Sequence, residues 1–198
     1  MFESLQKPQL PSGFSYYPQV LSMDKALALY QYLQTAMPWQ QPQIQVYGRK
    51  HPIPRLQCYV ADAGLNYAYS QMTLTPLPWS EPLRAMRARL EHHYQRPFNA
   101  LLLNYYRDGR DCMGWHSDDE QELGHQPVIA SISLGAPRKF TIKHKFNDEK
   151  HQLMLEHGSC LVMHGDSQHH YQHALPKQLK VQGGRINLTF RYIIGPKE

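Results

Sequence analysis

Residues 114–120 hold a histidine and an aspartate two positions apart, and these residue types could bind a metal ion. In an extended strand, residues i and i+2 point to the same side, so His116 and Asp118 could reach one ion from the end of a single strand. An imidazole and a carboxylate, completed by a second histidine, form the facial triad of non-haem iron(II). That triad leaves coordination positions open, as an oxygenase requires. The His-x-Asp spacing alone is a weak signal, because such tripeptides also arise by chance in solvated loops.

A third ligand must come from downstream of this pair. His173 lies in a short run that leads to Pro176, but His169 and His170 are close rivals, and local sequence does not separate the three. The other downstream candidates are His125, His144, His151, His157 and His164.

Residues 185–191 alternate strictly between polar and apolar side chains, which places Arg185, Asn187, Thr189 and Arg191 on one face of a predicted strand. A polar face inside a barrel costs free energy unless partners satisfy it. Two guanidiniums suit a ligand that carries two carboxylates, and 2-oxoglutarate is such a ligand. Asn104 and Tyr106 form a similar i, i+2 pair that could add hydrogen bonds. For the segment taken alone, an outer strand with a solvated polar face is the more common structure.

Helical patterns precede strand patterns along the chain. Met23–Ala36 has helical apolar spacing behind Ser22 as N-cap, and residues 80–95 form a second helix with Ser80 as N-cap. Residues 1–20 are expected to form an extended arm. Strands are predicted at residues 99–106, 128–134, 139–144, 152–156, 159–163 and 185–194. Helices followed by many short strands favour an α+β domain whose catalytic half is a sandwich or small barrel.

Composition narrows the class of protein. A chain of 198 residues, 41% hydrophobic and 19% charged, is expected to form one soluble domain. It has no apolar stretch near the roughly 20 residues of a membrane span and no secretory signal, so a cytoplasmic protein is expected. Cys58, Cys112 and Cys160 lie far apart, which predicts neither a disulfide framework nor a thiolate zinc site. The charge of +5 favours a polyanionic partner modestly.

In combination, these segments resemble the AlkB family of nucleic-acid demethylases, in particular the animal-type members active on double-stranded DNA. The likeness runs over about residues 46–192 and is carried by residues 104–109, 116–120, 130–135, 173–176 and 185–191. It implies a single dioxygenase domain with a jelly-roll core (a double-stranded β-helix) over about residues 99–194. The N-terminal helices would pack on this core, and residues 42–75 would form a nucleotide-recognition segment.

The same resemblance assigns the metal and cosubstrate ligands. Iron(II) would be held by His116, Asp118 and His173, which selects His173 among its rivals. Arg185 would bind the distal carboxylate of 2-oxoglutarate, and Arg191 the carboxylate next to the keto group. The full set implied for 2-oxoglutarate is Asn104, Tyr106, Arg185, Asn187, Thr189 and Arg191. Dioxygen would complete the metal site.

The resemblance also implies substrate contacts. Tyr47 would enter a duplex in place of a flipped base, and Tyr69 would stack on that base against His116. Phenylalanine is familiar at both tyrosine positions, so the sequence departs from the family pattern there. The implied substrate set is Tyr47, Gly48, Arg49, Arg55, Tyr67, Tyr69, Asp119 and Glu120. A methylated base must leave the stack to be reached, and aromatic faces and edge hydrogen bonds receive it.

The expected activity is oxidative demethylation of 1-methyladenine and 3-methylcytosine in duplex or single-stranded DNA, with release of formaldehyde and succinate. A monomer in the cytoplasm is expected, associated with the nucleoid, or with the nucleus in a eukaryote. One alternative keeps the cofactors but changes the substrate to RNA, a protein or a lipid. Another is a non-catalytic nucleic-acid-binding module, against which the complete polar set argues.

Overall fold

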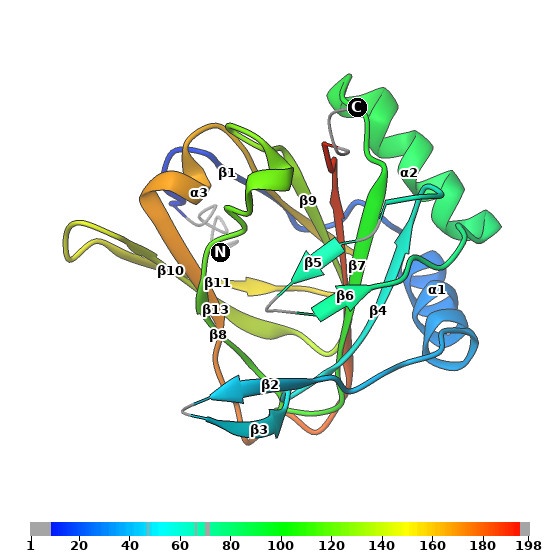
Figure 1. Cartoon of the computed structure of the whole chain (residues 1–198), viewed down its shortest axis with the longest axis horizontal. Coiled ribbons are helices and arrows are strands. Elements are labelled where there is room, and N and C mark those ends of the chain that lie inside the picture. The colour runs from blue at the N-terminus through cyan, green and yellow to red at the C-terminus, as the bar shows by residue number, and fades with distance from the viewer. Residues whose placement is uncertain (1–8, 47, 66, 70–71, 195–198) are drawn as a thin grey trace, which may run out of the picture.

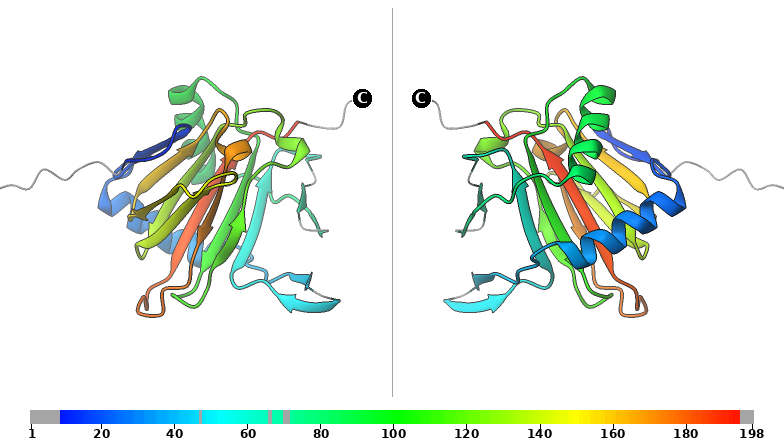
Figure 2. Two further views of the ribbon diagram at one scale, coloured as in Figure 1. Left: turned by 90° about the vertical axis from the view of Figure 1, so that its left-hand side faces the viewer. Right: turned by 90° about the vertical axis from the view of Figure 1, so that its right-hand side faces the viewer.

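The computed structural model describes residues 9–46, 48–65, 67–69 and 72–194. Of residue 46 and of strands β5 and β6 it describes the backbone only. Two antiparallel sheets face each other, and the helices lie outside them (Figures 1 and 2). The arrangement is the predicted jelly roll with helices packed on it.

The larger sheet contains six strands in the order β1-β12-β9-β14-β7-β4, and every neighbouring pair is antiparallel. Because side chains alternate along a strand, each strand presents one row to the second sheet and one row to the helices. The strands are β1 (Phe14–Tyr17), β4 (Leu56–Ala61), β7 (Ala100–Tyr106), β9 (Ile129–Gly135), β12 (Ser159–Met163) and β14 (Arg185–Arg191).

The smaller sheet has four antiparallel strands in the order β11-β10-β13-β8. Apolar side chains of both sheets, among them Ile129, Phe140, Leu153 and Leu161, fill the space between the sheets. Burial of these side chains stabilises the sandwich by about 25 cal/mol for each Å² of apolar surface removed from water. The strands are β8 (Met113–His116), β10 (Arg138–His144), β11 (Lys150–Leu155) and β13 (Tyr171–Leu175).

Helices α1 (Met23–Ala36) and α2 (Glu81–Tyr94) cover the outer face of the larger sheet. Leu33 of α1 and Leu83 of α2 are fully buried there with Ile186 and Leu188 of β14. The apolar row of β14 therefore packs under the helices, and its polar row is left facing the interior. Ser22 and Ser80 stand at the predicted N-cap positions, although neither side chain makes a capping hydrogen bond.

Two small hairpins lie outside the main sheets, β2 (Gln43–Val46) with β3 (Arg49–Pro52), and β5 (Tyr67–Tyr69) with β6 (Met72–Leu74). The β2–β3 hairpin stands away from the sandwich (Figure 2). Gly48, between β2 and β3, has φ of +76°, a left-handed conformation that glycine adopts without steric cost. Two short helices complete the fold, η1 (Gln121–Leu123) and α3 (Ser167–His170).

Several predicted elements match closely and others were missed. Both long helices are confirmed, as are the strands expected around β7, β9, β10, β11, β12 and β14. Two strands of the larger sheet, β1 and β4, come from upstream of residue 99, so the sandwich draws on more of the chain than residues 99–194. β1 lies in the segment expected as an extended arm and pairs with β12. Among the described helices, none is long and apolar enough to span a membrane.

Candidate active site

Strands β8 and β13 are neighbours in the smaller sheet, and their register places His116 opposite His173. Asp118 is the second residue after the end of β8. The Nε2 atoms of His116 and His173 each lie 3.9 Å from a different carboxylate oxygen of Asp118. The three ligand atoms lie within 4.8 Å of one another, and no other group of His, Cys, Asp or Glu in the described part of the chain could hold a metal. Two nitrogens and one oxygen are the donor set that suits ferrous iron.

The hydrogen bonding and charge around these side chains suit metal binding. His116 Nδ1 lies 2.9 Å from the carbonyl oxygen of Gly114 and donates to it, so Nε2 is the ring nitrogen that remains for a metal. Burial lowers the pKa of His173 to about 3, so its imidazole is neutral. Burial alone would raise the pKa of Asp118, but the positive charge of Arg191, the largest of the interactions that oppose burial, helps to hold that pKa below its usual value.

A hydrogen bond ties the backbone of Asp118 to α3. The amide of Asp118 donates to Oε1 of Gln168 at 2.8 Å, and Ser117 Oγ donates to the carbonyl of Tyr171 at 2.9 Å. Gln168 is buried, and α3 leads directly into β13. One side chain therefore fixes the position of the carboxylate relative to the strand that carries His173.

The rival histidines lie elsewhere. His169 is exposed on α3, and His170 stacks on His144 with ring centroids 5.9 Å apart. Neither belongs to the group formed by His116, Asp118 and His173.

A single pocket contains this group together with all six residues expected to hold a cosubstrate. Asn104, Tyr106, Arg185, Asn187, Thr189 and Arg191 come from the inner rows of β7 and β14, and Ser131 of β9 joins them. The pocket also has apolar walls, formed by Leu102, Met113, Phe140, Met163 and Leu175. The polar row of β14 therefore faces the interior and not solvent, as the cosubstrate hypothesis requires.

A hydrogen-bond chain fixes the polar row of β14. Arg185 donates to Ser133 Oγ at 2.8 Å and to Asn187 Oδ1 at 2.9 Å. The amide nitrogen of Asn187 then donates to Thr189 Oγ1 at 2.7 Å. In that bond the hydroxyl oxygen of Thr189 accepts, so the hydroxyl hydrogen remains available for a bond to a ligand. This series of hydrogen bonds orients each side chain before a ligand binds.

Charge in the pocket favours an anion. Arg185 and Arg191 are each only 2% exposed, and Arg191 NH2 lies 3.9 Å from Asp118 Oδ1. Burial lowers the pKa of Arg185 to about 10, well above neutral pH, so the guanidinium remains charged. Its Nε is buried and has no hydrogen-bond partner among the described residues. A buried donor of this kind is costly unless a ligand satisfies it, so a dicarboxylate beside a metal ion fits the residues present.

The expected substrate residues are only partly visible. Gly48 and Arg49 are exposed on the β2–β3 hairpin, and Asp119 is exposed after β8, where Lys145 Nζ lies 3.2 Å from its carboxylate. Glu120 is half-buried. Tyr47 and the side chains of Tyr67 and Tyr69 lie outside the described residues.

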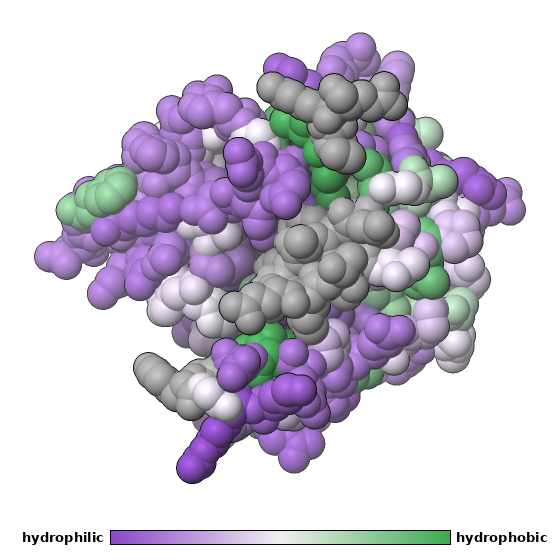
Figure 3. All heavy atoms as spheres, in the orientation of Figure 1, coloured by the Kyte–Doolittle hydropathy of each residue, from purple (hydrophilic) through white to green (hydrophobic). Residues whose placement is uncertain are grey.

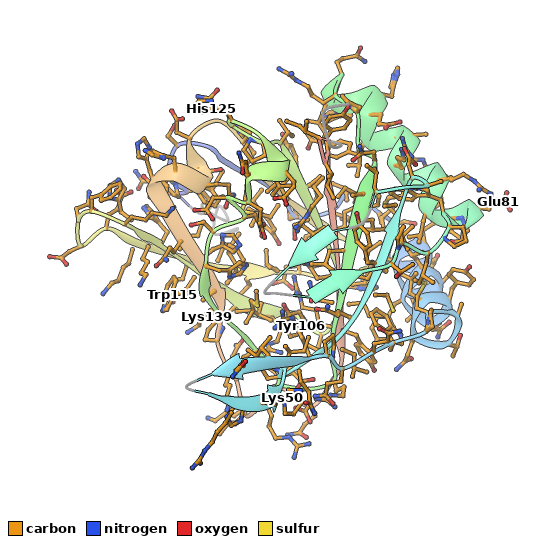
Figure 4. The ribbon with its side chains drawn as sticks, viewed as in Figure 1. Lys50, Glu81, Tyr106, Trp115, His125 and Lys139 are labelled. Atoms are coloured by element: carbon orange, nitrogen blue, oxygen red, sulfur yellow. The ribbon has the colours of Figure 1, made fainter. Side chains whose placement is uncertain are left out.

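In the orientation of Figure 1, the described part of the surface is largely hydrophilic (Figure 3). Lys50 projects from the outer hairpin, whereas Tyr106 lies in the middle of the molecule (Figure 4). Two other cations, Arg107 and Arg110, are paired with Asp111 and Asp108 within their own turn. Because each already has a carboxylate partner, these two arginines are less available to the phosphates of a nucleic acid than an unpaired arginine would be.

Among the residues expected to contact substrate, Arg55 has the most enclosed surroundings. It is buried and lines the same pocket as the metal and cosubstrate residues. Gln168 was missed altogether. No local pattern marks either residue, although the alternation of Ser131 and Ser133 with apolar neighbours does signal the inner row of β9.

Comparisons with known proteins agree with this geometry. A family model described as the 2OG-Fe(II) oxygenase superfamily matches residues 13–191. The chain is 42% identical over 159 residues to DNA oxidative demethylase ALKBH2 of Bos taurus, covering 76% of this chain and 57% of that protein. It is 36% identical to alpha-ketoglutarate-dependent dioxygenase alkB homolog 3 of Mus musculus, covering 92% of this chain and 68% of that protein. The solved structure of OsALKBH1 superposes with a TM-score of 0.63 at 19% identity, covering 92% and 99% of the two chains, which supports the fold alone.

Proposed function

The chain belongs to the 2OG-Fe(II) oxygenase superfamily, and we propose that it demethylates N-alkylated bases in DNA, with 1-methyladenine and 3-methylcytosine as substrates. One observation carries the proposal: the His-Asp-His group, in which Asp118 and His173 are buried, shares a single pocket with two buried arginines. The similarity to proteins named DNA oxidative demethylase ALKBH2 supports the choice of substrate. The match spans somewhat more than half of the bovine ALKBH2 protein, so the activity of this chain rests on its own site.

Iron(II) would be held by His116 Nε2, His173 Nε2 and a carboxylate oxygen of Asp118. With 2-oxoglutarate and dioxygen, the bound metal would supply the oxidation of the N-methyl carbon, with succinate and carbon dioxide as coproducts. The hydroxymethyl group formed on the base then departs as formaldehyde, which restores the unmethylated base.

The chain itself binds and orients the reactants. Arg185 would bind the distal carboxylate of 2-oxoglutarate, with Tyr106 and Asn187 beside it. Arg191 and Asn104 would bind the carboxylate next to the keto group, and Thr189 lies between the two arginines along the strand. The apolar walls of the pocket would limit the water around a bound ligand, so each charged hydrogen bond would act at a lower dielectric constant than in solution.

On the substrate side, a flipped base would enter next to the metal group. Tyr69 and Tyr67 would receive its ring, and Asp119 and Glu120 would face its edge. A carboxylate favours a base made cationic by methylation. Tyr47, Gly48 and Arg49 of the outer hairpin would fill the gap in the duplex and contact its backbone, and basic side chains such as Lys50 would add salt-sensitive affinity.

We further propose one domain that acts as a monomer, with a recognition segment over about residues 42–75 and a catalytic core whose larger sheet also includes β1 and β4. The enzyme would work in the cytoplasm on nucleoid DNA, or in the nucleus of a eukaryote.

The test measures formaldehyde and succinate from purified protein with iron(II), ascorbate and 2-oxoglutarate. The substrates are 1-methyladenine and 3-methylcytosine oligonucleotides in single-stranded DNA, duplex DNA and RNA, with a methylated peptide as a further arm. We expect equal amounts of the two products from DNA. Succinate without formaldehyde from any nucleic acid would refute the demethylase, and turnover of RNA or peptide alone would reassign the substrate.

A further inference from the structure

Arg55 occupies an unusual position for a residue next to an exposed hairpin. It follows β3 and precedes β4, yet only 5% of its surface is exposed, and it lines the pocket that contains His116, Asp118 and His173. The pocket thus contains a third arginine beyond Arg185 and Arg191. Two guanidiniums and a metal ion already suffice for the two carboxylates of 2-oxoglutarate, so the third cation needs another explanation.

Within the described part of the chain, the side chain of Arg55 makes one hydrogen bond, and its partner is a neutral group. Its Nε donates to Oδ1 of Asn104 at 2.8 Å, and both side chains are buried. A guanidinium has donors only, so the atom of Asn104 that faces it must be the amide oxygen. The NH2 group of Asn104 is thereby directed away from Arg55. Asn104 is on the inner row of β7 and lines the pocket, where an NH2 group is a donor for a carboxylate.

The backbone on either side of Arg55 is anchored. The amide of Ile53 donates to the carbonyl of Pro42 at 2.9 Å, and Gln41 Nε2 donates to the carbonyl of Ile53 at 2.8 Å. The amide of Cys112, just before β8, donates to the carbonyl of Pro54 at 3.0 Å. The segment that carries Arg55 is therefore bound both to the base of the β2–β3 hairpin and to the start of the strand that ends in His116.

We propose that Arg55 is a positioning residue for 2-oxoglutarate, because it holds the Asn104 side chain with its NH2 group ready for the carboxylate next to the keto group. The inference rests on the proposed use of 2-oxoglutarate. Arg55 acts through Asn104 and not by its own charge. The same segment joins the recognition hairpin to the cosubstrate pocket, so cosubstrate affinity depends on a residue outside the jelly-roll strands.

A double-mutant cycle tests this role. The dissociation constant of 2-oxoglutarate is measured by calorimetry on iron(II)-loaded protein without oxygen, for the wild type, Arg55→Met, Asn104→Ala and the double variant. We expect each single change to weaken binding about tenfold, the worth of one hydrogen bond to a charged group. The double variant should bind no worse than Asn104→Ala, since an effect that passes through Asn104 cannot be lost twice.

A charge-matched control is available on α2, where Arg89 is exposed and remote from the pocket. Arg89→Met should leave the dissociation constant unchanged. Multiplied losses in the double variant would show that Arg55 acts on the ligand directly, and an unchanged constant in Arg55→Met would show that it does not act at all. Either result overturns the proposal.

Two further measurements keep the outcome decisive. Arg55→Lys retains the charge but lacks the Nε–H group, so we expect binding about threefold weaker than wild type, whereas a direct charge effect predicts wild-type affinity. This variant decides the question if Arg55→Met does not fold, which thermal melting of each variant reports. If the wild-type protein does not bind 2-oxoglutarate at all, the result refutes the proposed function itself, independently of the role of Arg55.

Discussion

The inner row of the larger sheet and the β2–β3 hairpin carry similar residues but are built in opposite ways. Arg185 is buried among partners that its hydrogen bonds fix, whereas every residue of β3, including Arg49 and Lys50, is exposed. A buried polar group must be matched by partners, so small changes there are costly. An exposed charge exchanges its partners for water at little cost. We therefore expect changes in the inner row of the larger sheet to affect the reaction, and changes in the β2–β3 hairpin to affect the binding of substrate.

Removing a metal ligand should have the largest effect. Loss of one of three ligands exceeds the tenfold to hundredfold cost of losing an outer partner, so His173→Ala is expected to weaken iron(II) binding more than about a hundredfold and to abolish formaldehyde release. Metal titration followed by the product assay measures both. His169→Ala, a change of the same type at an exposed position of α3, should retain affinity and activity. Equal losses in the two variants would contradict the assignment of the third ligand.

Arg185→Met should come next in magnitude. It removes the charged partner of a carboxylate and the hydrogen bond that Arg185 donates to Asn187, which in turn donates to Thr189. We therefore expect 2-oxoglutarate to bind about fiftyfold more weakly. Iron(II) affinity should change little, because Arg185 is not a metal ligand. Calorimetry with each ligand separates the two constants. Arg89→Met on α2 serves as the control, and a normal cosubstrate constant in Arg185→Met would remove the pocket from the proposed role.

Gln168→Leu probes how far rigidity extends beyond the ligands themselves. The buried amide of Asp118 would lose its acceptor, and we expect iron(II) affinity to fall about tenfold while the fold persists. Gln172, half-buried on β13, offers a matched Gln→Leu control that should bind iron(II) as the wild type does. If Gln168→Leu melts at a much lower temperature yet binds iron(II) normally, the residue serves stability and not the metal site.

The smallest effect is expected on the hairpin. Lys50→Gln should weaken DNA binding about threefold, equally for all sequences, and lower the slope of log affinity against log salt by about 1. Binding of 2-oxoglutarate should not change. Lys25→Gln, an exposed position on α1, provides the control. A change in the cosubstrate constant of Lys50→Gln would show that the exposed region also governs the reaction, and the comparison would then fail.

The same contrast explains which features the sequence predicts. Residues 185–191 reveal their role because the two faces of β14 meet different surroundings, polar groups in the pocket and helices outside. β4 was missed because nearly all of it is buried, so its residues do not alternate in polarity. β8 was expected only through the metal hypothesis, which placed His116 at a strand end, because its four residues are partly exposed and carry no strand pattern.

Arg55 and Gln168 could not have been placed from their neighbours in the chain. Each acquires its position from a partner about fifty residues away, Asn104 for Arg55 and Asp118 for Gln168. Ligand types at short spacing are visible in a sequence, but the side chains that hold those ligands depend on contacts made only by the folded chain. The pair of His116 and Asp118 was therefore foreseeable from the local sequence, and the side chains that support it were not.

The pairing of β1 with β12 has a consequence for handling the protein. β12 consists of five buried residues, Ser159–Met163, and β1 covers one of its edges, while Phe14 packs edge-on against Tyr171 with ring centroids 5.6 Å apart. A chain shortened to begin after Tyr17 would expose an apolar strand with unpaired amides and carbonyls, which is a template for pairing with another copy. We therefore expect β1 to protect the protein from aggregation, and a truncation that shortens the N-terminus should keep Phe14 and the residues after it.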